Sequence, residues 1–183
     1  MSGIIGLSPN VKSGIISDTV VGKFPVGHIL KVYHSMISTT AYSTGSNVTI
    51  WTGATLTLSS SSNKILTFGN FSVGGDRGGT MKLQISTNSG SSYSDISTAD
   101  MGVTDAYQDG VAVLGFHNGA SLIRENSSYQ SSFTHLHAPG NTSAKYQLVI
   151  NSSSSSYAIM INRRDITDSW GGLSWVTQME VVA

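Results

Sequence analysis

The stretch MKLQIS, residues 81–86, alternates apolar and polar side chains without exception. Successive side chains of a β-strand point to opposite faces, so this alternation predicts a strand with one buried and one solvent-facing side. Residues 54–58 (ATLTL) have the same period of two, and so do residues 146–150 apart from Val149. No window shows the 3.6-residue period of an amphipathic helix. These runs predict an all-β protein.

Further strands are indicated across the rest of the chain. They are expected at 28–37, 47–51, 54–58, 64–73, 80–87, 111–117, 130–138, 145–151, 157–163 and 174–182. Clusters of Gly, Ser, Asn and Asp separate them, as at 59–63 and 88–92, and short strands with such spacing are typical of a sandwich or barrel. In the last strand, one alternate set of residues is expected to face the core: Leu173, Trp175, Thr177, Met179 and Val181.

The composition bounds the function classes. The 183 residues suffice for one domain, and 39% hydrophobic residues suffice for a core. Lys and Arg total 10 and Asp and Glu total 10, so no excess of cations is present to bind nucleic acid by counterion release. Cys is absent, which excludes disulfides and thiolate chemistry. The sequence shows no apolar run of about 18 residues and no signal-peptide pattern, so membrane insertion is not expected.

The first 26 residues differ from the remainder. They are rich in Gly, Ser, Ile and Val and have no clean period, and the residues FPVG at 24–27 indicate a break. We therefore divide the chain into an N-terminal segment, 1–26, and a β domain, 27–183. The segment is either an extended arm that lies along another surface or a flexible leader. The apolar residues that an arm would use for anchoring are Ile4, Ile5, Leu7, Pro9, Ile15, Ile16, Val20 and Val21.

Two of the expected strands are apolar on both faces. One is 28–37, and the other begins at 157 with YAIMI. A strand of an isolated two-layer sandwich needs only one apolar face, so the second face requires a cover. The cover is either a loop of the same chain or another subunit, and the pattern favours a homo-oligomer. The candidate subunit contact comprises Tyr157, Ile159, Met160 and Ile161.

Side chains that could carry chemistry are few. His135 and His137 share one strand face with Phe133, which would suit two ligands of a metal, although ordinary surface or interface histidines are the simpler interpretation. Asp95, Asp100, Asp105 and Asp109 lack the spacing of a calcium loop. Whether either group binds an ion stays open. No catalytic, metal or cofactor site is predicted.

No enzyme motif is visible in the chain. The Gly-rich residues 74–79 indicate a hairpin tip, since they lack the Lys-Ser/Thr ending of a phosphate loop, and no Gly-x-Ser-x-Gly elbow occurs. Trp51, Trp170 and Tyr129 could form a carbohydrate-binding face among Ser- and Thr-rich strands. They could equally lie in the core or at subunit contacts.

The order of short motifs along the chain carries a resemblance. The chain opens with GLSPNVKSGI (6–15), enters the first strand through VGKFPVGHILKV (21–32) and ends in WVTQMEV (175–181). Between them come TLTL (55–58), NKIL (63–66), SAKYQL (143–148) and INR (161–163). This order resembles a family of small virion structural proteins of tailed bacteriophages, especially aquatic and marine ones. Residues 95–128 match none of its motifs.

The resemblance implies an antiparallel β-sandwich of jelly-roll type, a homotrimer and a location in the virion. Two roles fit it. One is a capsid decoration, or cement, protein whose partner is the major capsid protein. The other is a tail-fibre or receptor-binding protein that contacts tail proteins or a host surface receptor, including glycans. One domain with an arm and without a repetitive shaft favours the decoration role.

Overall fold

The computed structural model describes residues 26–75, 79–96, 112–116, 128–152, 158–163 and 172–183. These residues form strands and no helix, which confirms the predicted all-β class. The strands are β1 (Ile29–Ile37), β2 (Ala41–Ser43), β3 (Val48–Thr52), β4 (Leu56–Thr57), β5 (Lys64–Gly75), β6 (Gly79–Ser86), β7 (Ser94–Asp95), β8 (Ala112–Phe116), β9 (Ser128–His137), β10 (Ser143–Ser152), β11 (Ile159–Ile161) and β12 (Ser174–Val181).

Every strand expected from the sequence is present, and its ends lie within two residues of those predicted. The strands that the sequence did not indicate are β2 and β7, which have three and two residues. Alternation over so few residues gives no signal.

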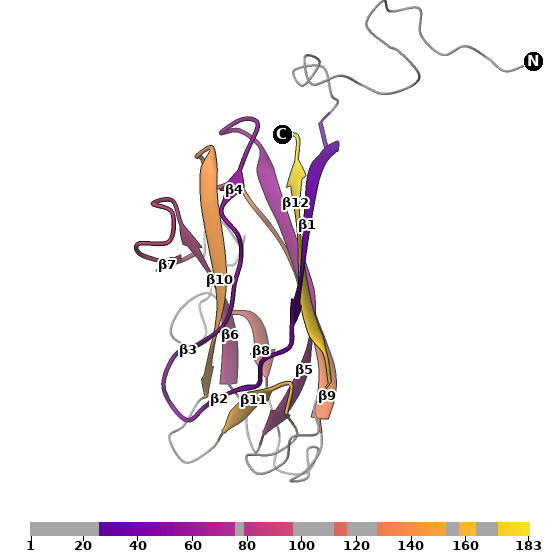
Figure 1. Ribbon diagram of the computed structural model, residues 1–183, viewed down its shortest axis with the longest axis vertical. Helices are drawn as coiled ribbons and strands as arrows, with labels where there is room; N and C mark the ends of the chain where they lie inside the picture. The colour runs from indigo at the N-terminus through magenta and orange to yellow at the C-terminus, as the bar shows by residue number, and fades with distance from the viewer. Residues whose placement is uncertain (1–25, 76–78, 97–111, 117–127, 153–157, 164–171) are drawn as a thin grey trace, which may run out of the picture.

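The strands form two antiparallel sheets that lie face to face (Figure 1). In the first sheet the order is β1-β12-β5-β9. One edge of β5 pairs first with β12 and then, further along, with β11, and the other edge of β11 pairs with β2. In the second sheet the order is β3-β10-β6-β8. There β4 pairs with β10 beyond β3, and β7 pairs with β6.

The strand order identifies a jelly roll. The eight strands of the four-stranded cores are, in chain order, β1, β3, β5, β6, β8, β9, β10 and β12. Numbered one to eight, they give the sheets 1-8-3-6 and 2-7-4-5. The first strand thus pairs with the last and the second with the seventh, as in a chain that winds as two Greek keys into a sandwich. The predicted jelly-roll β-sandwich is confirmed.

The core lies between the two sheets. Met81 and Leu83 of β6 are fully buried, and so are Tyr146, Leu148 and Ile150 of β10. Burying each such aliphatic side chain contributes about 1.5–3 kcal/mol. The alternation on which the fold prediction depended therefore separates core from surface as expected.

The face predicted for the last strand is wrong. Leu173 is 62% exposed, whereas Ser174, Val176, Gln178 and Glu180 of β12 are buried. The buried set is mostly polar, and each polar side chain in it has a hydrogen-bond partner inside the protein, such as Thr67 for Gln178. Hydrophobicity alone therefore assigned the wrong face, because paired polar groups tolerate burial.

Candidate functional site

The outer sides of the two sheets differ in chemistry. Three complete rows of residues cross the outer side of the first sheet, as the strand register shows. The rows are Val32, Met179, Leu66 and Leu136; then His34, Thr177, Phe68 and Thr134; then Met36, Trp175, Asn70 and Ser132. We call this surface the apolar face, because more than half of its residues are apolar and none is Asp, Glu, Lys or Arg.

Large apolar side chains of the apolar face stand in solvent. Val32 is 56% exposed, Met36 52% and Leu136 46%. Of the two strands predicted to be apolar on both faces, the one at 28–37 thus has a second face that the described residues leave exposed. A contiguous apolar patch of this kind, rather than a single exposed side chain, marks an interaction surface.

An aromatic cluster lies at the centre of the apolar face. The indole of Trp175 lies between the ring of His34, tilted at 38° with a centroid distance of 5.9 Å, and the ring of Phe68, which meets it edge-on at 5.9 Å. The Nδ1 atom of His34 is 2.9 Å from the hydroxyl of Thr177, which orients the imidazole. Neighbouring strands β1, β12 and β5 thereby hold one flat aromatic group in place.

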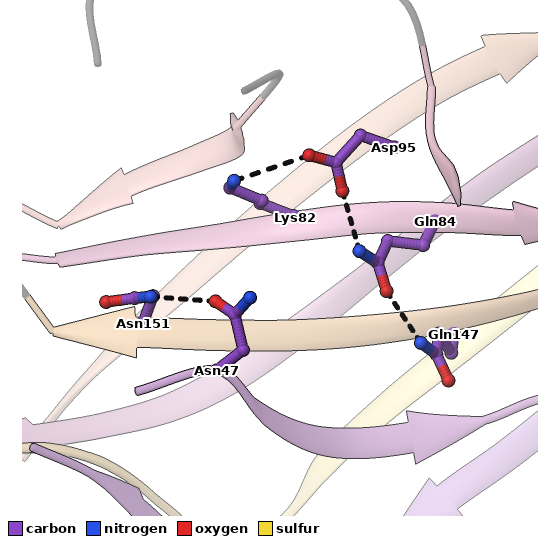
Figure 2. Close-up of polar contacts among 6 residues, drawn as sticks. All are labelled: Asn47, Lys82, Gln84, Asp95, Gln147 and Asn151. Carbon is purple, nitrogen blue, oxygen red and sulfur yellow. Dashed lines mark hydrogen bonds and ion pairs between the residues drawn. The ribbon is translucent and has the colours of Figure 1, made fainter. Parts of the chain in front are cut away.

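The outer side of the second sheet is polar (Figure 2). We call it the polar face and define it by Asn47, Lys82, Gln84, Asp95, Gln147 and Asn151. Gln147 donates to Gln84 at 2.6 Å, and Gln84 donates to Asp95 at 2.6 Å. Lys82 donates to the same carboxylate at 3.3 Å.

A further amide pair lies in the polar face, where Asn151 donates to Asn47 at 2.7 Å. These two groups of bonded side chains lie on β10, β6 and β7 and at Asn47, directly before β3. The polar face is therefore an internally bonded, solvated surface, in contrast to the apolar face.

A buried carboxylate ties the turn after β4 to the last strand. Glu180 is fully buried and accepts hydrogen bonds from the Ser59 N–H at 2.6 Å and the Asn63 side chain at 2.7 Å. The Lys31 ammonium lies 3.4 Å from its second oxygen. Burial by itself raises the pKa of Glu180, but the bonds from Asn63 and Ser59 and the charge of Lys31 outweigh it and lower the pKa. The carboxylate thus joins the turn at 59–63 to β12, and we call this set of contacts the latch at Glu180.

The predicted histidine pair lies inside the sandwich. His135 and His137 are buried on the same face of β9 as Phe133, so the shared face is confirmed and the surface or interface location is wrong. The Nδ1 atom of His137 is 2.9 Å from the phenol oxygen of Tyr146, and burial raises the pKa of that phenol. Among the described residues, no group of three His, Cys, Asp or Glu side chains could hold a metal.

The described residues of the predicted subunit contact at 157–161 are buried within the single chain, so they cannot contact another subunit. Ile159, Met160 and Ile161 are each at most 1% exposed within the single chain, and Tyr157 lies outside the described residues. The strand β11 lies inside its sheet, paired with β5 on one edge and β2 on the other, and side chains on both of its faces are buried. The cover that the pattern required is therefore the chain itself.

The remaining candidates divide between the core and the part of the chain that is not described. Trp51 is buried and cannot serve a sugar-binding face, whereas Asp95 belongs to the polar face. Trp170, the side chain of Tyr129 and the other three acids lie outside the described residues. So do all the arm residues, namely Ile4, Ile5, Leu7, Pro9, Ile15, Ile16, Val20 and Val21. No described helix is long and apolar enough to cross a membrane.

The fold and these surfaces define a jelly-roll protein with one apolar and one polar outer sheet face. No family model matches the chain, and no curated protein matches it. Solved structures of infectious bursal disease virus, strains Gx and Gt, match 99% of this chain with TM-scores of 0.35 and 0.36 and identities of 13% and 12%. The chain spans 41% and 42% of those chains. The jelly-roll assignment rests on the strand order of the two sheets.

Proposed function

We propose that the protein is a structural component of a virus particle, and more specifically a capsid decoration (cement) protein of a tailed bacteriophage. The observation that carries the proposal is the apolar face on a jelly-roll sandwich, which exposes apolar side chains for protein contacts. The motif order of the sequence supports the bacteriophage assignment. The role is mechanical and needs no catalytic step or cofactor.

The N-terminal arm supplies the attachment in this proposal. Its apolar pairs, such as Ile4-Ile5 and Ile15-Ile16, lie in grooves between neighbouring subunits of the major capsid protein. Three copies of the chain assemble, each with its own arm. Attachment at several points then gives a total affinity well above that of one arm, because the later arms bind intramolecularly.

Deletion of residues 2–22 tests the attachment. The truncated chain is expected to remain folded, since the described strands and the core between them lie within residues 29–181, and to lose binding to capsids that lack this protein. A second variant keeps the full length of the arm and replaces Ile4, Ile5, Ile15 and Ile16 with Ser, and it is also expected to lose binding. Co-sedimentation with capsids measures both variants. Binding that survives in either variant would refute anchoring by the apolar arm residues.

The second candidate is a tail-fibre or receptor-binding protein that contacts glycans. The observation in its favour is the Trp175 cluster, because sugar rings stack on aromatic faces flanked by hydroxyl and amide groups such as those of Thr134 and Asn70. A glycan array separates the two roles. Glycan binding that is lost in Trp175→Ala favours the receptor role, and silence of the folded protein across the array favours decoration.

A further inference from the structure

The apolar face exposes large apolar side chains to water, which is unfavourable unless another surface covers them. Its residues Val32 and Met36 lie on the edge strand β1, and Leu136 lies on β9 at the opposite edge, so the exposed apolar groups span the whole width of the sheet. The corresponding surface of the second sheet is polar and bonds to itself. The asymmetry indicates that one outer side of the sandwich faces solvent and the other faces protein.

Charge determines what kind of protein fits. The three rows of the apolar face contain no Asp, Glu, Lys or Arg, so a charged partner would lose hydration there without gaining an ion pair. A matching surface must itself be apolar and uncharged. This chain has such a surface, namely the apolar face, and its formal net charge of zero means that two copies do not repel each other.

The size of the apolar face sets the strength of the contact. Four strands about 4.8 Å apart and three rows about 6.8 Å apart give a plan area of roughly 390 Å². This is within the range of patches that mark interaction sites, and below the roughly 800 Å² per partner of a standard stable interface. A contact of this size between copies is weak in dilute solution and gains strength where other attachments hold the copies together.

We propose that the apolar face is the surface through which this chain binds a second copy of itself. Two copies related by a two-fold axis stack their sheets about 10 Å apart, and around a three-fold axis the same residues converge on the axis. In both cases the exposed side chains of Val32, Met36 and Leu136 are buried against another copy. The proposal does not depend on the virion role, because it concerns the purified chain alone.

Sedimentation of the purified protein at increasing concentration, from about 1 µM to about 1 mM, tests the proposal over the affinity range of weak interfaces. The wild-type chain is expected to associate. Leu136→Lys, at an exposed position, is expected to weaken the association by at least about tenfold, because it places an unpaired charge in the contact. The matched control is Thr49→Lys, which changes an exposed strand residue outside the apolar face and leaves the association unchanged.

Thermal unfolding of each variant shows that it is folded, and Val32→Ser provides a second, uncharged test if Leu136→Lys does not fold. A wild-type chain that stays monomeric throughout the range overturns the proposal. So does an assembly that both apolar-face variants leave intact, or one that Thr49→Lys disrupts equally. An arm deletion that abolishes capsid binding while self-association persists would separate this proposal from the proposed function.

Discussion

Asn162 shows how one residue organises the end of the sandwich. It has a positive φ of 57°, a conformation that Asn tolerates better than most residues, and it is buried. Its amide donates to the carbonyls of Ile37 at 2.5 Å and Thr39 at 3.1 Å, and it accepts from the Ser174 hydroxyl at 2.6 Å. One side chain thus joins β11 to the end of β1 and the start of β12.

Replacing Asn162 with Ala is expected to lower the free energy of unfolding by about 3 kcal/mol, since it removes three buried hydrogen bonds and leaves Ala at positive φ. Urea denaturation measures the change. Asn47→Ala is the control, because the exposed Asn47 makes one amide contact and should cost about 0.5 kcal/mol or less. Equal losses in the two variants would contradict the role assigned to Asn162.

The latch at Glu180 predicts how stability depends on pH. Its pKa in the folded protein is below the ordinary value of 4.5. The contribution of Glu180 is therefore fully present above the unfolded pKa and is lost as pH falls through the folded pKa. The free energy of unfolding, measured between pH 2 and 7, should decline on the acid side of that value. Glu180→Gln should be less stable at neutral pH and show a smaller decline, and an unchanged decline would assign the acid sensitivity to other groups.

At the scale of elements, Gly79 determines how closely β6, β10 and β11 approach. A Cβ atom at Gly79 would lie 2.3 Å from the carbonyl oxygen of Asn151 and 2.3 Å from a methyl group of Ile159. Both are closer than atoms can pack, so the backbone of β10 would have to shift.

Gly79→Ala is expected to cost about 2–3 kcal/mol of unfolding free energy, in the range of overpacked sites. Gly140→Ala is the matched control: its φ is +65° with nothing within 4 Å, so only backbone strain of about 1 kcal/mol is expected. Chemical denaturation of both variants tests this. A smaller loss for Gly79→Ala than for Gly140→Ala would show that the close approach is not a constraint.

The strands themselves were predictable because their side chains alternate over five or more residues, as in β6 and β10. The face of β12 was not, because the residues it buries, such as Gln178 and Glu180, are polar and find their partners on distant segments. Partners more than 100 residues apart leave no local signal. The same reason applies to 159–161, which are buried within the chain and pair with β5 and β2, strands remote in sequence.

At the scale of the whole molecule, the alternation predicted a sandwich or barrel, and the resemblance supplied the jelly-roll order that the sheets confirm. The difference between the two outer faces could not be predicted. It depends on which strands become neighbours, and only the pairing of β1, β12, β5 and β9 brings Val32, Met36 and Leu136 into one surface. The anchoring role of residues 1–26 and the three-fold assembly stay predictions.

The most direct test of the proposed function is the amount of this protein in purified virus particles. Quantitative mass spectrometry gives its copy number relative to the major capsid protein. A decoration protein that covers the shell is expected at a copy number comparable with that of the capsid subunit. A handful of copies per particle would contradict decoration and favour a tail or fibre location, and absence from the particles would contradict a virion role altogether.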